Sequence, residues 1–236
     1  MKSKKLKKWT TLLTCATALT VMTACSQSNS QATGTTTSSK TSAVTATTSK
    51  KTNKNNSNYF TSKDSDTSYD KSSASKIKLS GSSADVSGDG VAVSGSTVTI
   101  SKAGTYVISG KSDGVQIKVD AGDSDNVHIV LDGATMTNTN APITATSAGH
   151  VYLTLKDGTT NTLSDSSSNN DEDADAVIYS KGDLAINGSG TLNIDAKKSK
   201  GIKANDSLHI TGGTYKITSV GDAFNVNDEL NITGTT

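Results

Sequence analysis

The chain has 236 residues, with 23 lysines, 22 acidic residues, no arginine and two cysteines. The charge is unevenly divided, because residues 77–236 hold 11 lysines against 19 acidic residues. An acidic domain argues against a nucleic-acid partner, which requires phosphate neutralisation, and two cysteines exclude a disulfide framework.

Residues 1–24 are predicted to be an export signal. A lysine-rich start precedes the apolar run TLLTCATALTVM, which is too short for a comfortable membrane span. The following MTAC resembles the lipobox of bacterial lipoproteins, in which the cysteine is lipidated and becomes the mature N-terminus. We therefore expect a lipid on Cys25 that anchors the protein at the extracellular face of the cell membrane.

Residues 25–76 are rich in Ser, Thr, Lys and Asn and poor in apolar side chains. Such a segment cannot bury enough apolar surface to offset the entropy lost on ordering. The composition predicts a disordered tether between the lipid anchor and a domain over residues 77–236.

Short β-branched runs separated by Gly, Asp, Asn and Ser fill residues 77–236, which predicts β-strands throughout. Apolar residues recur in register at spacings of 24, 33, 24 and 22 residues. This first column comprises Val127, Val151, Leu184, Leu208 and Leu230. A second inward column comprises Ile129, Leu153, Ile186, Ile210 and Ile232. The residues between the two columns should point outward, namely His128, Tyr152, Ala185, His209 and Asn231.

Three short strands per repeat predict an all-β, single-stranded parallel β-helix, in which each coil buries its inward residues on its neighbours. An antiparallel sandwich is the alternative, although it does not require this register. We expect a monomer. The sequence stops at LNITGTT, inside a new coil, so we also expect a domain truncated at its C-terminus.

Three segments carry a resemblance to a known family: VAVSGSTVTISKAGTYVISG, DAVIYSKGDLAINGSGTLNI and GIKANDSLHITGGTYKITSVGDAFNVND. Residues 85–234 resemble the carbohydrate-binding domain of extracellular Firmicute proteins. The resemblance implies a right-handed parallel β-helix similar to polysaccharide lyases. It also implies binding of cellulose or acidic pectin-like polysaccharide, and bound calcium.

The residues give little support to catalysis. A lyase needs a base, and without arginine only the lysines of DAKKSKGIKAND could serve, namely Lys197, Lys198, Lys200 and Lys203. A glycoside hydrolase needs two carboxyls flanking a cleft, and no such signature stands out. We predict a non-catalytic binding protein and keep two alternatives, a lyase-like enzyme and a structural or adhesion module with a protein partner.

Polysaccharide contacts are expected on the outward faces of the coils, where tyrosine rings can stack on sugar rings. The candidate residues are Tyr152, Tyr179, Lys203, Asn225 and Asn231.

An acidic insertion, Ser164 to Asp175, lengthens one repeat. Asp171, Asp173 and Asp175 have the spacing of the first ligands of an EF-hand loop. However, Ala176 stands where such a loop requires Gly, and Gly182 stands where it requires Glu. Turn aspartates recur nearby, so calcium could be shared across a coil edge, or all could be solvated turns. The candidate ligands are Asp165, Asp171, Asp173, Asp175, Asp183, Asp206, Asp222 and Asp228.

Overall fold

The computed structural model describes residues 59–236, so Cys25, the export signal and most of the predicted tether lie outside the described residues. A single turn of 3-10 helix, η2 (Ser62–Ser65), precedes eighteen strands. No helix in this part of the chain is long and apolar enough to cross a membrane. The strands are β1 (Ser75–Gly81), β2 (Ser83–Ser87), β3 (Val91–Ser94), β4 (Thr97–Ile100), β5 (Gly104–Asp113), β6 (Gln116–Asp120), β7 (Asn126–Thr137), β8 (Ile143–Ser147), β9 (His150–Leu155), β10 (Thr160–Ser164), β11 (Ala176–Ser180), β12 (Leu184–Gly188), β13 (Thr191–Ala196), β14 (Lys200–Ala204), β15 (Leu208–Ile210), β16 (Thr214–Ser219), β17 (Phe224–Val226) and β18 (Leu230–Ile232).

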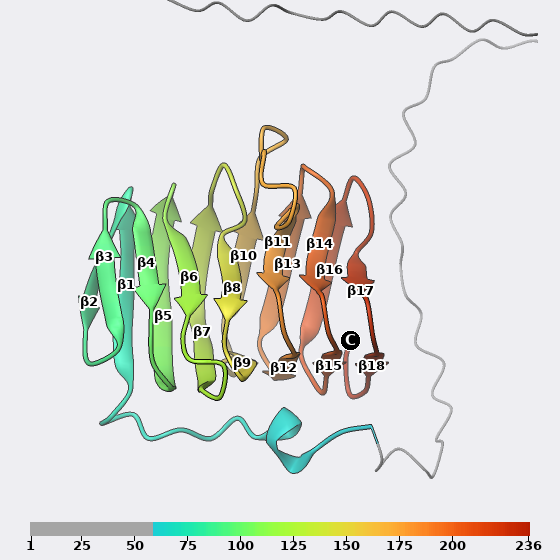
Figure 1. The fold of residues 1–236 in the computed structure, drawn as a ribbon, viewed down its shortest axis with the longest axis horizontal. Helices are drawn as coiled ribbons and strands as arrows, with labels where there is room; N and C mark the ends of the chain where they lie inside the picture. The colour runs from blue at the N-terminus through green and yellow to red at the C-terminus, as the bar shows by residue number, and fades with distance from the viewer. Residues whose placement is uncertain (1–58) are drawn as a thin grey trace, which may run out of the picture. The chain divides into compact units, whose positions relative to one another are not determined.

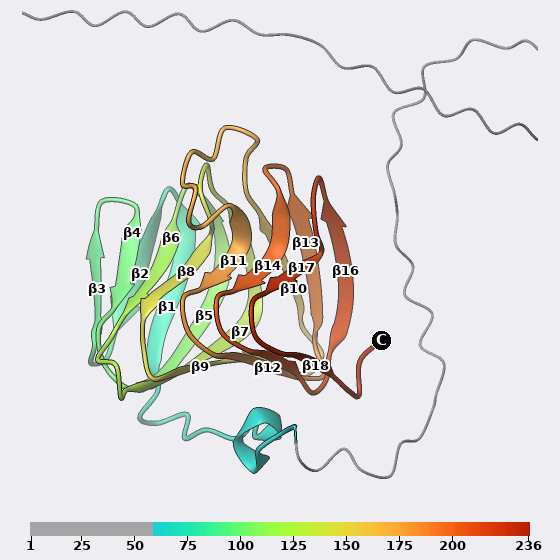
Figure 2. The ribbon, with the colours of Figure 1, turned by 45° about the vertical axis from the view of Figure 1, so that its right-hand side comes forward.

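Parallel pairing between successive coils organises the strands into two sheets, which Figures 1 and 2 show from two directions. One sheet runs in the order β16-β13-β10-β7-β9-β12-β15-β18, with β5, β1 and β2 attached through β7. The other runs β17-β14-β11-β8-β6-β4-β3. Antiparallel pairs occur at the N-terminal end, between β1 and β2 and between β3 and β4. The fold is β-helix-like, and the parallel pairing overturns the antiparallel sandwich.

The long strand β7 divides its sheet into two faces. Both halves pair with β5 on one side; on the other side the first half pairs with β9 and the second half with β10. We call the surface over β7, β9, β12, β15 and β18 the strap face. The surface over β10, β13 and β16 is the threonine face, after Thr160, Thr191 and Thr214, which pair in register. The surface over β8, β11, β14 and β17 is the insertion face.

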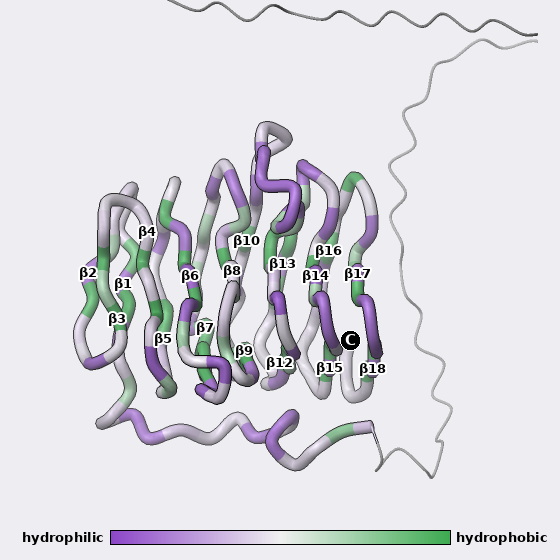
Figure 3. Tube along the Cα trace, viewed as in Figure 1, coloured by the Kyte–Doolittle hydropathy of each residue, from purple (hydrophilic) through white to green (hydrophobic). Residues whose placement is uncertain are grey.

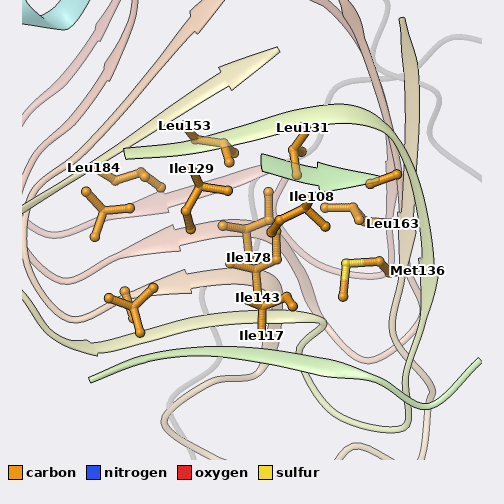
Figure 4. Close-up of a cluster of buried hydrophobic side chains, with 14 of the residues drawn as sticks. Ile108, Ile117, Ile129, Leu131, Met136, Ile143, Leu153, Leu163, Ile178 and Leu184 are labelled. Atoms are coloured by element: carbon orange, nitrogen blue, oxygen red, sulfur yellow. The ribbon is translucent and has the colours of Figure 1, made fainter. Parts of the chain in front are cut away.

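The predicted apolar columns are confirmed strand by strand. Val127 pairs with Val151, then Leu184, Leu208 and Leu230 follow in register. The second column from Ile129 to Ile232 stacks in the same way. Alternate residues point inward and meet the equivalent residue of the next coil, as Figure 4 shows for Ile129 and Leu153. Figure 3 shows that hydrophobic stretches recur within the strands of successive coils.

Gly188 ends β12 where the chain turns toward the threonine face. Its φ of 98° lies in the left-handed region, and an added Cβ would collide with the carbonyl oxygen of Leu155 in the preceding coil. Glycine is required here by both backbone conformation and close packing of coils.

Part of the predicted tether lies within the described residues and packs against the coils. The tether was expected to extend to residue 76, but residues 59–74 lie against the strap face and β1 begins at Ser75. We call residues 59–74 the strap; it runs below the strands in Figure 1. The composition of the strap is polar, yet specific hydrogen bonds to the coils compensate for its ordering.

The core columns give a first prediction. Ile186→Ala removes a fully buried side chain and should lower the free energy of unfolding by about 2–5 kcal/mol, because the rigid stack cannot close the cavity. Thr218→Ala, at an exposed position of the threonine face, should change it by less than about 0.5 kcal/mol. Urea unfolding followed by circular dichroism measures both, and equal losses would contradict the assigned core.

Candidate functional site

The strap is anchored through one buried carboxylate. Asp64 is only 1% exposed, although it lies in a polar segment. Its carboxylate accepts a hydrogen bond from the backbone N–H of Thr61 at 2.7 Å, which caps η2. Nδ1 of His209, on β15, lies 3.1 Å from Oδ2 of the same carboxylate. The acid therefore stabilises the local turn and also binds it to the coils.

The backbone of the strap is held by side chains from the coil face. Asn187 Nδ2, on β12, donates to the carbonyl oxygens of Asp64 and Asp66, both at 3.1 Å. The hydroxyl of Thr211 donates to the Asp64 carbonyl at 2.7 Å. These donors project from the outward side of the sheet, where they would otherwise meet solvent or a ligand.

A chain of polar side chains extends the anchor along the strap face. The Thr154 hydroxyl donates to Asn187 Oδ1 at 2.6 Å, because Asn187 Nδ2 is used by the strap. The hydroxyl has one proton, so it must accept from Nε2 of His128, which lies at 2.7 Å. His128 is thereby fixed with a proton on Nε2.

Aromatic contacts accompany these hydrogen bonds. The His150 and Tyr152 rings stack with centroids 4.2 Å apart, and Lys63 Nζ lies 5.7 Å from the Tyr152 ring centre. Phe60 meets His209 edge-on, and Tyr69 meets His128 in the same way. All three histidines of the chain thus lie beneath or beside the strap.

A small cavity of about 220 Å³ opens between the strap and the coil face. We call it the notch. A lysine, a carboxylate, hydroxyls and an aromatic ring surround it, a combination that can hydrogen-bond and stack on a polar ring. Its lining residues are Lys63, Asp66, Ser68, Gly104, Thr105, Asn126, His128 and Tyr152.

Burial controls the charge of two histidines. Burial lowers the pKa of His128, opposed by the nearby Asp66 carboxylate. Burial also lowers the pKa of His150, opposed by Asp183 and Asp64. Both rings are therefore neutral at neutral pH, and the strap does not depend on a charged His128 or His150.

The acidic insertion covers part of the insertion face, much as the strap covers part of the strap face. Residues 165–175 form the insertion between β10 and β11, as predicted, and Ala174 packs with Tyr179 and Ala141. Asp175 forms ion pairs with Lys200 and Lys203, and the Lys203 ammonium lies 5.6 Å from the Tyr179 ring centre. Burial opposes ionisation of Asp175, but the two lysines outweigh it and lower the pKa of this carboxyl.

The predicted polysaccharide contacts lie on two different faces. Tyr152 and Asn231 share the outward column of the strap face, whereas Tyr179, Lys203 and Asn225 form one column on the insertion face. The two tyrosines point outward from the coils, as expected, but are 9% and 6% exposed because the strap and the insertion cover them. Of the five, Tyr152 lines the notch.

The eight predicted calcium ligands do not converge. Within residues 59–236, no three His, Cys, Asp or Glu side chains are arranged to hold a metal ion. Asp171 accepts hydrogen bonds from backbone N–H groups inside the insertion, and Asp183 accepts one from Ser207. The predicted ligands therefore do not form a shared site across the coil edge in the described residues. Bound calcium stays a prediction.

Asp165 differs from the other seven acids. It is 1% exposed, and its Oδ1 accepts the backbone N–H of Lys197 at 2.7 Å. Its Oδ2 is buried without a hydrogen-bond partner, and so is Oδ1 of Asn140 in the corresponding turn of the preceding coil. Burial raises the pKa of the Asp165 carboxyl, opposed by the amides of Lys197 and Lys198.

Sequence reasoning missed Asp64 and Asn187. His128 and His209 were placed correctly in one outward column with Tyr152, but they were expected to face solvent. The clustering of two histidines and a tyrosine in one column was the available signal.

The buried histidines give a second prediction. Their lowered pKa means that the unfolded chain binds more protons below the usual value of 6.5. The stability contributed by the neutral rings is therefore present above the usual value of 6.5 and is lost progressively as the pH falls below it toward the lowered pKa of the folded state. Thermal melts should show this loss, and His150→Gln should reduce it. A His150→Gln protein with the full wild-type pH dependence would contradict the assignment.

Comparisons with known proteins agree with this architecture. A structure titled as the polysaccharide lyase-like protein from C. thermocellum, a gadolinium derivative, matches with a TM-score of 0.62 and 30% identity, over 69% of this chain and 81% of that chain. A carbohydrate-binding domain-containing protein of Acetivibrio thermocellus is 38% identical over 123 residues, which is 50% of this chain and 43% of the relative. The chain thus spans less than half the length of that relative. The family model for carbohydrate-binding domain-containing proteins matches residues 94–236, so the chain belongs to this family.

Proposed function

We propose that this protein binds polysaccharide without cleaving it, with cellulose and acidic pectin-like glycans as the candidate polymers. Membership of the carbohydrate-binding family carries the proposal. The notch supports it, because Tyr152 offers an aromatic surface beside Lys63, Asp66 and His128. A sugar ring that stacks there would find hydrogen-bond donors and acceptors on both the strap and the coil face.

The coil geometry suits a repeating polymer. Equivalent outward residues of successive coils are spaced by about 4.8 Å, so one chain lying along the stack would meet the same face repeatedly. We further propose that the coils wind in the right-handed sense, which strand connections of this kind almost always take.

A lyase-like enzyme is the second candidate, because the structural neighbour bears that name. Three of the four lysines considered as a base are engaged in ion pairs, which argues against it. Lys200 and Lys203 pair with Asp175, and Lys197 pairs with Asp195. Formation of unsaturated uronate, followed by its ultraviolet absorbance, would establish the lyase.

The sequence motifs support a location at the cell surface. We propose that Cys25 is lipidated and that the domain is displayed as a monomer outside the membrane, at the end of the Ser- and Thr-rich segment. A structural or adhesion module that binds a protein partner would be displayed outside the membrane in the same way. Retention by a protein partner but by no glycan would favour that role.

We propose that structural calcium binds at the turn that holds Asp165. Asp165 Oδ2 and Asn140 Oδ1 are both buried oxygens without hydrogen-bond partners, in turns of neighbouring coils. Hard cations take carboxylate, amide and backbone carbonyl oxygens as ligands. A cation there would compensate for the buried charge of Asp165.

Binding gives a third prediction. The full chain should be retained on cellulose or polygalacturonate, and Tyr152→Ala should weaken retention about tenfold, or about 1.4 kcal/mol, through loss of stacking. Tyr59→Ala is the matched control, since Tyr59 is 52% exposed and lies outside the notch. Circular dichroism verifies that each variant folds. Absence of retention on every wall polymer would refute the binding function.

Calcium gives a fourth prediction. Added calcium should raise the melting temperature, with a stabilisation of about 2.7 kcal/mol when free calcium is 100 times Kd, and chelation should reverse it. Asp165→Asn should abolish the response, whereas Asp171→Asn should retain it. A melting temperature that ignores both calcium and chelator would rule out structural calcium.

A further inference from the structure

His150 and His209 flank the carboxylate of Asp64 from two coils of the strap face. His209 Nδ1 lies 3.1 Å from Asp64 Oδ2, and His150 Nε2 lies 4.0 Å from Asp64 Oδ1. The carboxylate between them is almost fully buried. Two imidazoles that enclose one carboxylate form a specific anion-binding arrangement, here filled by the chain itself.

Asp64 does not satisfy the hydrogen-bonding capacity of both histidines. His150 Nε2 is buried and has no hydrogen-bond partner, since 4.0 Å is too long for a hydrogen bond. The other ring nitrogen of His150 lies 3.9 Å from Asp183. A carboxylate less constrained than Asp64 could approach both His150 and His209 at hydrogen-bonding distance.

The strap crosses several coils in an extended path, as a bound glycan chain would. It crosses from Phe60 at β15 to Tyr69 at β7, along the direction in which the coils stack. Its carbonyl oxygens accept from Asn187 and Thr211, and its carboxylate fills the space between the histidines. It adds no strand to the sheet, and most of its residues are exposed, so it can leave without disturbing a coil.

We propose that His150 and His209 form a carboxylate-binding niche on the strap face, that Asp64 fills this niche in the closed form, and that a carboxylate-bearing glycan displaces it. The notch is the part of this surface that stays accessible while the strap is in place. Because Tyr152 stacks on His150, a polymer bound at the notch extends directly into the niche. This inference rests on the proposed glycan binding and specifies acidic polymers as its ligands.

Hydrogen exchange of the strap in the intact protein tests the displacement. Asp64→Asn should speed amide exchange in residues 59–74 about tenfold, because it removes the charge held by the niche. Asp70→Asn is the matched control, since Asp70 lies on the same strap and its carboxylate accepts hydrogen bonds from the neighbouring Ser72 rather than from a coil. It should leave exchange unchanged.

Ligand specificity is tested with two probes that differ only in charge. Oligogalacturonate should speed exchange of the strap, and its methyl ester should not. His150→Gln with His209→Gln should remove this difference. Slower exchange of the strap on binding would mean that the strap closes over the ligand, and unchanged exchange would mean that the glycan binds elsewhere; either result overturns the proposal.

A glycan-independent measurement separates this proposal from the proposed function. Asp64→Ala empties the niche, so acetate should raise the melting temperature of this variant more than chloride does, and more than it does for Asp70→Ala. Rescue by acetate without retention on any glycan would support the niche and refute the proposed function. Retention on glycans without rescue would do the reverse.

Discussion

The parallel register between coils determines the position of every outward side chain. Because Val127, Val151, Leu184 and Leu208 stack inward without a shift, the residues that follow them are fixed in one outward column. A slip by one residue would exchange the two sides of the strand. The alignment of His128, Tyr152 and His209 is therefore a direct consequence of how the apolar core packs.

This constraint explains which features could be predicted. The columns follow from the period-2 pattern and the repeat spacing, both of which are local properties of the sequence. The insertion could be located for the same reason, since residues 165–175 interrupt an otherwise regular spacing. Pairs such as Ile178 with Ile202 follow from the register without any knowledge of side-chain contacts.

The packing of the strap and of the insertion onto the coils could not be predicted in this way, because it depends on contacts between residues that are distant in the sequence. Asn187 binds the carbonyl of Asp64 across a separation of 123 residues. Composition correctly describes the strap as polar and poor in apolar side chains, and such segments are generally disordered. The strap is ordered because its polar groups meet complementary donors, a property that no average over its residues can reveal.

One acid anchors the strap and another anchors the insertion, and the two anchors differ in how far salt can screen them. Asp175 on the insertion pairs with Lys200 and Lys203, whose side chains are 19% and 17% exposed, so salt can screen this attraction in part. Asp64 on the strap is 1% exposed and lies between imidazoles, so salt has little access to it. The proposed displacement of the strap would instead depend on proton uptake by His128 and His150 and on competing carboxylates. The proposed glycan binding at Tyr152 and at Tyr179 should therefore depend on different conditions, because different interactions hold the strap and the insertion over these two tyrosines.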